Sequence, residues 1–543
     1  MLTVRRLTLA HLWVAFAAFG AACLLGLWQM WMRSPLAAPF ATPANYYLSV
    51  TAHGVSMAYV LTTFFIMGFG YYVAETALKR PLPGLRFAWI AYWVALVGVV
   101  MTVASILSGR ASVLYTFYPP MTATAWFYIG LVLVVAGSWV WCVLMLAAMA
   151  AWKRANPGQP VPLAMYATTA NAVMWLWTTV GVAVELLFQV IPAAFGWTQT
   201  VDVGLSRTLF SWTLHPIVYF WLFPAYIAFY SLSPRAAGGR LYSDTMGRLS
   251  FVLLLLYSLP VGMHHLFMDP EQSTGFKLVQ MALTALVTVP TLLTVFTICA
   301  SMEIAGRLRG GKGLFGWIAA LPWDRPMMLA TGLAFVMLWF GGGGGLINMS
   351  YGMNAMVHNT SWVTAHFHLI FGGSVVLMYF AIAYEIWPSL TGRGFASLKP
   401  LRLQLWLWTI GMMVMTIPWH VLGLQGQWRR VAQFDYGNPA IAPWAPWVIV
   451  SVAGGLLLVA SAALFIANLV GLHQRRAASP APPPVGYALA VHPTTHVPAV
   501  LNGFAFWNWL VLVLMLVAYG FPIAHFFIHQ APAALVHHMG GGG

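Results

Sequence analysis

Thirteen apolar runs, each of about 20 or more residues, constrain the fold of this chain more than any other feature. An α-helix of about that length crosses the hydrocarbon core of a bilayer. Only 6% of the 543 residues are charged and 61% are hydrophobic, far outside the usual composition of soluble domains. We therefore predict an all-α, polytopic membrane protein with spans at about 8–32, 46–75, 86–109, 122–152, 165–196, 205–232, 247–268, 274–303, 326–349, 360–388, 403–426, 445–470 and 502–527.

The distribution of cations predicts how these spans are oriented. An odd number of spans places the termini on opposite sides of the membrane, and cytoplasmic loops are enriched in Lys and Arg. With a cytoplasmic N-terminus, only six of the 25 cations fall in outer segments: Arg33, Arg110, Arg207, Lys277, Arg429 and Arg430. We interpret the net charge of +15 as this topology signal, facing anionic lipid, and not as nucleic-acid binding.

The loops between spans are short, which predicts one transmembrane domain over residues 1–543. The longest polar segment, 471–500, is rich in Pro and Ala and is predicted to be a flexible cytoplasmic connector. Inside the ninth span, the run Gly341–Gly345 favours either close helix packing or contact with a flat cofactor. Three cysteines are scattered singly and form neither a disulfide framework nor a thiolate metal site: Cys23, Cys142 and Cys299.

Histidines inside the spans are the strongest functional signal. An ionisable residue at membrane depth needs a partner or a metal to offset the loss of water. Six histidines lie in the outer halves of spans: His53, His215, His264, His265, His366 and His368. Any one of them alone is more often a hydrogen-bonded core residue, whereas the six together favour metal ligation, with copper the most distinctive partner of three imidazoles.

The spacing of these histidines predicts more than one centre. Residues two apart on an α-helix point about 200° apart, so His366 and His368 address opposite sides of their span. His264 and His265 can face one site if the end of their helix is partly unwound, and His215 can supply a third imidazole. At about 1.5 Å per residue, His53 and His368 lie roughly 10 and 12 Å from the outer ends of their spans, a similar depth.

This set of residues resembles catalytic subunit I of the heme–copper terminal oxidases, and most closely the B-family cytochrome c oxidases. The likeness covers essentially the whole chain, including the number of spans. It implies that His53 and His368 are the axial pair of a low-spin heme, b-type, and that His366 ligates a high-spin heme, a-type. It assigns the copper ion called CuB to three further residues: His215, His264 and His265.

The resemblance also gives a role to the tyrosine beside His215. Tyr219 is four residues on, so the two share one helix face. The family joins the matching pair covalently, which leaves a catalytic phenol that supplies an electron and a proton during oxygen reduction. Ile217 stands where the A family has glutamate, which favours the B family.

Four residues are similar in position to those that contact heme propionates in the family. Arg429 and Arg430 suit this role because guanidinium groups bind carboxylates in a forked geometry. His358 and Asn354 fall where B-family members have histidine and aspartate. The asparagine departs from that pattern.

Two polar stripes match the single proton-uptake route of the B family. Tyrosines recur on one face of the sixth span and threonines every three residues on the eighth: Tyr219, Tyr226 and Tyr230, with Thr291, Thr294 and Thr297. Either stripe alone has a structural explanation, because such hydroxyls bond to their own helices. Glu185, one of only ten acidic residues, is either a member of a proton-exit or water network or a structural hydrogen-bonding group.

The resemblance implies an enzyme that reduces O2 to water with electrons from cytochrome c and moves protons. The chain has no two-cysteine copper motif, so a CuA-bearing subunit II, with a possible small membrane subunit, is expected to deliver electrons. The expected location is a bacterial or archaeal plasma membrane. Two alternatives remain: a nitric-oxide reductase, whose best-known members have glutamate in place of Tyr219, and a non-redox transporter.

Overall fold

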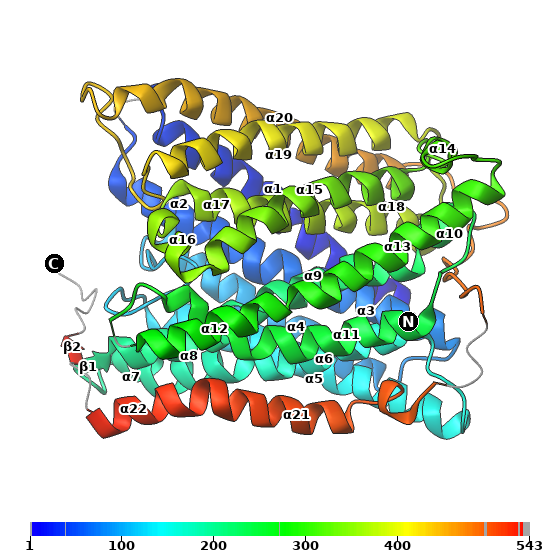
Figure 1. The fold of residues 1–543 in the computed structure, drawn as a ribbon, viewed down its shortest axis with the longest axis horizontal. Helices are drawn as coiled ribbons and strands as arrows, with labels where there is room; N and C mark the ends of the chain where they lie inside the picture. Colours follow the sequence, from blue (N-terminus) through cyan, green and yellow to red (C-terminus); the bar gives the residue numbers. More distant parts are fainter. Residues whose placement is uncertain (1–2, 38–39, 271, 493–496, 530–532, 536–543) are drawn as a thin grey trace.

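The computed structural model confirms an all-α membrane architecture. It describes residues 3–37, 40–270, 272–492, 497–529 and 533–535. Thirteen of its helical segments are long and apolar enough to cross a membrane, and they run side by side along the molecule (Figure 1). In the described residues, the only strands are one short antiparallel pair, β1 (Thr200–Asp202) and β2 (Ala533–Leu535).

The spans are built from helices that are in part interrupted. In chain order they are α1 (Val4–Met32); α2, η1 and α3 (Pro43–Val55, Ser56–Leu61, Thr62–Leu78); α4 (Leu85–Leu107); α5 (Ala125–Ala155); α6, η2 and α7 (Leu163–Glu185, Leu186–Val190, Ile191–Ala194); α8, α9 and α10 (Val203–Leu214, Pro216–Ser231, Ser233–Ala236); α11 and η3 (Asp244–Ser258, Leu259–Leu266); α12 and α13 (Thr274–Leu286, Thr288–Leu308); α15 (Pro326–Met349); α17, η4 and α18 (Ser361–Phe367, His368–Val376, Leu377–Thr391); α19 (Lys399–Leu424); η5 and α20 (Ala442–Trp444, Ala445–His473); and α21, η7 and α22 (Ala505–Met515, Leu516–Gly520, Phe521–His529). Three short helices lie outside the spans: α14 (Gly316–Ala319), α16 (Tyr351–Val357) and η6 (Ala499–Leu501).

The interruptions occur next to the predicted ligands. Proline lacks an N–H and clashes with the carbonyl four residues back, so the sixth span breaks between His215 and Pro216. Pro260 lies where α11 gives way to the 3-10 segment η3. The π-helical segment η1 begins three residues after His53, and the π-helical η4 begins at His368. Such π-turns are rare and concentrate at functional sites.

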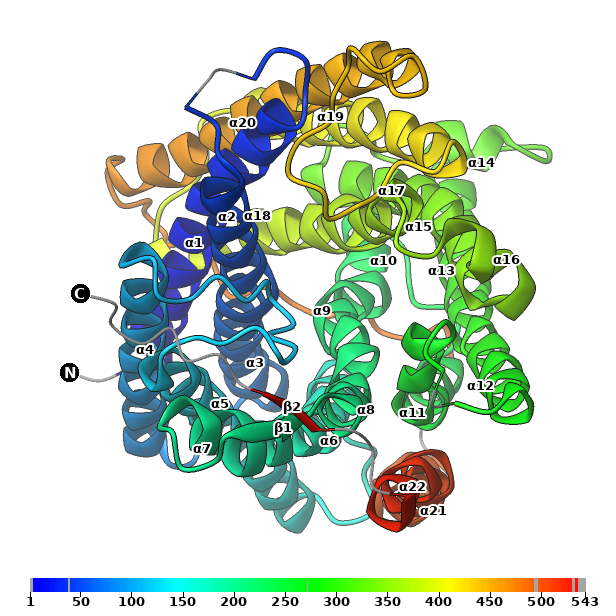
Figure 2. The ribbon, with the colours of Figure 1, turned by 90° about the vertical axis from the view of Figure 1, so that its left-hand side faces the viewer.

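Three spans form the inside of the bundle, as the end-on view shows (Figure 2). They are α2–α3, α8–α10 and α17–α18, and 89% of the most apolar 18-residue window of each is buried. The corresponding share is 33% for α12–α13 and for the last span. The inner spans contain four of the six histidines: His53, His215, His366 and His368.

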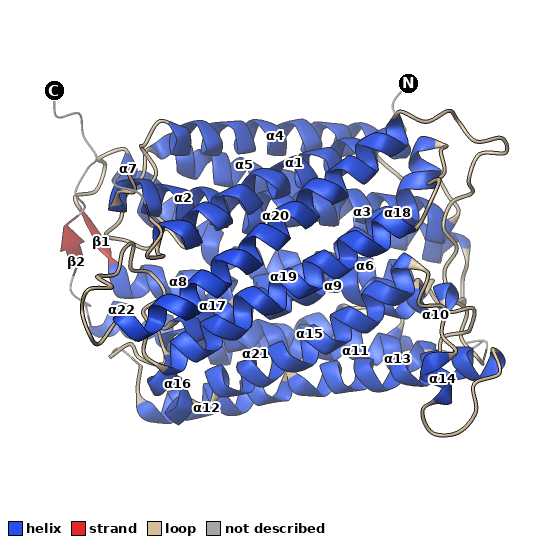
Figure 3. Cartoon of the chain, turned by 90° about the horizontal axis from the view of Figure 1, so that it is seen from above, coloured by secondary structure: helices blue, strands red, loops and turns tan. Residues whose placement is uncertain are grey.

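The two ends of the bundle differ. The pair β1–β2 lies at one end and α14 at the other (Figure 3), and we call these the β-strand end and the α14 end. At the α14 end, the connector between the last two spans is hydrogen-bonded to the bundle, although its composition predicts a flexible segment. Tyr487 and Thr76 join their hydroxyls over 2.6 Å, and the Val485 N–H donates to the Tyr72 hydroxyl over 2.8 Å. These two tyrosine hydroxyls give the connector polar anchors that its overall composition does not reveal.

Candidate metal centres

One large cavity brings most of the predicted residues together. Its volume is about 1580 Å³, larger than the roughly 300–1,000 Å³ of common small-molecule pockets, so it has room for more than one cofactor. All six predicted histidines line it, as do Tyr219, Tyr226, Thr291, Asn354, His358, Arg429 and Arg430. Four predicted residues lie outside its lining: Tyr230, Thr294, Thr297 and Glu185.

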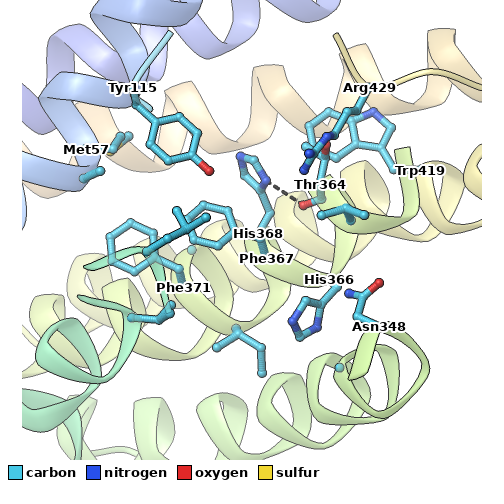
Figure 4. A pocket seen from close by; sticks show the side chains of 18 of the residues that line it. Met57, Tyr115, Asn348, Thr364, His366, Phe367, His368, Phe371, Trp419 and Arg429 are labelled. Carbon is cyan, nitrogen blue, oxygen red and sulfur yellow. Dashed lines mark hydrogen bonds between the residues drawn. The ribbon is translucent and has the colours of Figure 1, made fainter. Parts of the chain in front are cut away.

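His53 and His368 face each other across part of this cavity. Their ring centroids are 6.4 Å apart and the rings are within 19° of parallel. The His53 Nδ1 is 2.8 Å from the Ala22 carbonyl oxygen, and the His368 Nδ1 is 2.8 Å from that of Thr364 (Figure 4). A carbonyl only accepts hydrogen bonds, so both Nδ1 atoms donate and each Nε2 keeps its lone pair for a metal.

His366 points to a different part of the cavity. In Figure 4 its ring lies beside Asn348, away from the ring of His368. The His366 Nδ1 donates to the Gly341 carbonyl over 2.7 Å, which again leaves Nε2 as the acceptor atom. This arrangement agrees with the expectation that two histidines two residues apart address different centres.

The glycine run of α15 permits close packing, one of the two purposes that its sequence left open. A β-carbon at Gly341 would lie 2.8 Å from Ile370, and one at Gly345 would lie 2.9 Å from the His366 ring, so these glycines permit close packing. Gly342 and Gly343 have no neighbour within 4 Å of such an atom, and both line the cavity. The middle of the run therefore has no packing neighbour, and contact with a flat cofactor stays an expectation.

His215, His264 and His265 form the second constellation. One ligand atom from each lies within 4.8 Å of the others, and the rings of His215 and His264 are centred 4.3 Å apart. In the described part of the chain, the buried Nε2 atoms of His215 and His265 have no hydrogen-bond partner. The end of the span is not simply unwound, as the spacing predicts, but forms the 3-10 segment η3. Three converging imidazoles with free nitrogens suit copper, with zinc and iron less distinctive.

Residues 6–457 match the family model described as cytochrome C and quinol oxidase polypeptide I. The chain belongs to this family. It is 39% identical to cytochrome c oxidase subunit 1 of Thermus thermophilus over 90% of this chain and 88% of that protein. It is 26% identical to the heme-copper oxidase subunit I+III of Aeropyrum pernix over 84% of this chain and 56% of that longer protein. A cryo-EM structure of a heme-copper terminal oxidase dimer matches with a TM-score of 0.93 and 32% identity, covering 99% of this chain and 95% of that chain.

The cavity fits the heme and copper of this oxidase family. The near-parallel pair His53 and His368 leaves two opposed Nε2 atoms, as a bis-histidine heme requires. His366 adds a third available Nε2, and its ring lies against Gly345. The free nitrogens of the three-histidine constellation complete the donor set for a copper ion.

Tyr219 lies beside His215, and the two polar stripes lie next to each other. The rings of His215 and Tyr219 are centred 5.0 Å apart, and both line the cavity. Two hydrogen bonds join the stripes: the Tyr226 hydroxyl donates to Thr291 over 3.2 Å, and the Tyr230 hydroxyl donates to Thr294 over 3.1 Å. Thr297 bonds the Leu293 carbonyl of its own helix over 2.7 Å. Ser250, which the sequence did not single out, lies 2.7 Å from the Thr294 hydroxyl.

The loop after α19 brings cationic groups to the cavity. Arg429 donates to the Asn359 side chain over 2.9 Å, and within the described residues its buried Nε has no partner. Burial and the adjacent Arg430 lower the pKa of Arg429 to about 10, so the group is still charged at pH 7. Arg33 bonds the Arg429 carbonyl over 3.2 Å and stabilises this loop.

His358 and Asn354 form a pair beside these arginines. The His358 Nδ1 is 3.0 Å from the Asn354 Oδ1, and the Asn354 amide donates to the Asn348 carbonyl over 2.6 Å. Burial, with Arg429 and other nearby cations, lowers the pKa of His358 to about 4, so its imidazole is neutral at pH 7. Asn354 therefore orients a neutral His358, and an amide stands where other B-family members have a carboxylate.

Glu185 lies outside the cavity and is fully buried. The hydroxyl of Ser206, which is also buried, is the polar group that faces its carboxylate, although the contact is looser than a standard hydrogen bond. A buried carboxylate with so little support calls for an ordered water or a proton. Both expectations therefore stay open, with Ser206 as the partner in a structural hydrogen bond or as a member of a water network.

Sequence reasoning missed several residues around the site. Arg33 and Arg207 were recognised as outer cations but given no role, and Arg207 pairs with Asp269 over 2.8 Å. Trp419 places its ring edge-on to His368 at 5.2 Å. The rarity of cations in outer segments was the signal that could have singled out the two arginines, whereas no sequence pattern marks Trp419.

Proposed function

We propose that this chain is the oxygen-reducing subunit of a membrane-bound cytochrome c oxidase. The observation that carries the proposal is the inner span α17–η4, from which His366 and His368 reach two different sets of residues in one cavity. One set leaves two opposed imidazole nitrogens, and the other places three imidazoles and a phenol near His366. When bound, the hemes and copper supply electron transfer and oxygen binding.

Each cofactor has a proposed set of protein ligands. His53 and His368 hold a low-spin heme, which we assign as b-type, and His366 holds a high-spin heme, assigned as a-type. The copper CuB is held by His215, His264 and His265. Arg429, Arg430, His358 and Asn354 contact heme propionates, a role supported by their position on the cavity wall.

Tyr219 is the proposed donor of a proton and an electron in the cavity, and it is joined to His215 as in the family. Its ring lies 5.0 Å from that of His215, centre to centre, and both groups line the cavity, which supports this role. Tyr226 and Thr291 also line the cavity, and their bonded hydroxyls are the next donors and acceptors in the direction of the α14 end. They connect Tyr219 with the polar stripe of α13.

Protons reach Tyr219 along that stripe from the α14 end. The Thr294 hydroxyl has two alternative acceptors, the Pro290 carbonyl at 2.8 Å and Ser250 at 2.7 Å, so it can reorient as a proton passes. We propose that the α14 end is cytoplasmic, so electrons and protons arrive from opposite sides. Each charge so separated is worth about 2.3 kcal/mol per 100 mV. Glu185 belongs to a water network on the exit side, which is supported by its burial with Ser206 as the neighbouring hydroxyl.

The proposed partners follow from the positions of the cysteines in the described part of the chain. Its cysteines lie in different spans, so a CuA-bearing subunit II delivers electrons from cytochrome c, with a possible small membrane subunit. The complex lies in a bacterial or archaeal plasma membrane with the N-terminus of this chain in the cytoplasm.

Cofactor analysis of the purified complex tests the proposal. Pyridine hemochrome spectra are expected to give two hemes, one b-type and one a-type, and copper analysis is expected to give CuB in addition to CuA. Reduced cytochrome c should support oxygen uptake that exceeds nitric-oxide consumption. A preparation without a Soret band would exclude the oxidase, and faster turnover with nitric oxide than with oxygen would favour a reductase.

A further inference from the structure

Helix α12 (Thr274–Leu286) buries polar side chains and exposes apolar ones. The buried residues of this helix are Lys277, Gln280 and Thr284, three and four positions apart and therefore on one face. On the opposite side, Leu278 and Val279 are 47% and 52% exposed. Apolar groups facing lipid need no explanation, whereas three polar groups facing inward require specific partners.

All three partners belong to η3 or to the turn that follows it. Lys277 donates to the Asp269 carbonyl over 2.8 Å, and the Gln280 amide donates to the Pro260 carbonyl over 3.2 Å. The Thr284 hydroxyl is 3.0 Å from the His264 Nδ1. One face of α12 thus contacts the segment that carries two of the three proposed copper ligands.

The segment η3 needs such support because of its geometry. It is a 3-10 helix of 8 residues, whereas 3-10 runs longer than 3–4 residues are uncommon. Gln280 takes the Pro260 carbonyl, and the Gly262 N–H donates to the Tyr519 hydroxyl over 2.8 Å. Groups from other helices therefore replace hydrogen bonds that a regular α-helix would supply itself.

The contact at Thr284 also determines the tautomer of His264. The Thr284 hydroxyl donates its only hydrogen to the Gln280 carbonyl, 2.6 Å away. Its oxygen can therefore only accept from His264, so the proton of the imidazole is on Nδ1 and the lone pair is on Nε2. The backbone of Val261 also bonds this ring and limits how far it turns when Thr284 is changed.

We infer that the polar face of α12 positions the His264–His265 pair for copper, with Thr284 fixing the His264 tautomer and Gln280 holding the backbone of η3. This inference rests on the proposed function, because it takes the three histidines as copper ligands. Thr284 and Gln280 are positioning residues, since each acts through η3. Hydrogen-bond partners of metal-bound histidines commonly change metal affinity by about 10- to 100-fold.

The test measures how fast the intact complex loses copper to a chelator, with the infrared band of carbon monoxide on that copper as a report of site geometry. Thr284→Val and Gln280→Leu should lose copper about tenfold faster than wild type and shift or broaden the band. Thr284→Ser, which keeps the hydroxyl, should behave as wild type. The matched control is Thr409→Val, because the Thr409 hydroxyl bonds the Leu405 carbonyl of its own helix, far from η3 in the chain.

The outcomes separate this inference from the proposed function. Wild-type copper kinetics and an unchanged band in both Thr284→Val and Gln280→Leu would overturn the role of α12 while leaving the copper site intact. Loss of copper from Thr409→Val at the same raised rate would also overturn it. A His264→Ala complex with the full copper content of wild type would instead contradict the proposed function itself.

Discussion

The two histidine constellations are supported in different ways. His53 and His368 lie in inner spans, and backbone carbonyls of helices hold their Nδ1 atoms. The three-histidine constellation lies where helices are interrupted, at the break before Pro216 and on the 3-10 segment η3. There, His264 depends on the side chain of Thr284. The difference therefore lies in the partners: main-chain carbonyls hold the imidazoles of His53 and His368, whereas a side chain of another helix holds that of His264.

This difference predicts that damage to one centre can leave the other intact. The strongest test is His366→Ala, which removes a ligand that points away from the ring of His368. We expect complete loss of the high-spin heme and of oxygen reduction, with the low-spin heme retained. Optical spectra of the intact complex check this, and simultaneous loss of both hemes from a folded protein would refute the assignment of two separate centres.

The next effect concerns chemistry without loss of a cofactor. Tyr219→Phe removes only the hydroxyl from the ring beside His215, so heme and copper contents should stay near wild type. Oxygen reduction should fall by about 100-fold or more, because the proton donor is gone. Oxygen-electrode turnover within a few-fold of wild type would contradict the role of this phenol.

Backbone support of the copper region can be weakened directly at Gly262. A β-carbon there would lie 1.9 Å from the Ser211 carbonyl oxygen, so Gly262→Ala must move η3 away from α8. We expect a loss of stability of about 1–3 kcal/mol from overpacking and a lower copper content, with the low-spin heme unchanged. Gly471→Ala is the matched control, since its β-carbon meets no atom within 4 Å. Full copper content in Gly262→Ala would show that η3 tolerates displacement.

The smallest expected effect lies outside both constellations. Thr294→Val removes the hydroxyl that accepts a hydrogen bond from Tyr230. The proton-coupled steps of oxygen reduction should slow roughly tenfold, which corresponds to about 1.4 kcal/mol in their activation free energy. Electron transfer into the low-spin heme should be unchanged. Flow-flash kinetics can separate the two, with Thr169→Val as a control whose hydroxyl bonds its own helix. Equal rates of proton uptake in Thr294→Val and wild type would show that the threonine stripe has only a packing role.

Sequence reasoning succeeded where regular helix geometry governs the position of a residue. The thirteen spans, the different directions of His366 and His368 and the alignment of each stripe on one helix face all follow from helical periodicity and apolar length. These features depend on residues close in sequence. A pattern of 3.6 residues per turn is therefore sufficient to predict them.

The remaining features depend on contacts between distant segments. The inward face of α12 is polar, and hydropathy alone does not predict that polar residues of a membrane span are useful there. Their partners on η3 become evident only when the two segments pack. The π-helical segments after His53 and at His368 contain no proline, so the sequence does not predict these interruptions. The sequence also gave no reason to place Tyr519, from the last span, against η3.

The central claim is that the His53–His368 pair and the three-histidine constellation hold different metals. Heme and copper analysis of His53→Ala and His264→Ala complexes, measured side by side in protein that elutes as an intact assembly, tests it most directly. The account predicts that His53→Ala loses the low-spin heme and keeps CuB, whereas His264→Ala loses CuB and keeps the low-spin heme. Loss of the same cofactor from both variants, or retention of all cofactors by either one, would contradict it.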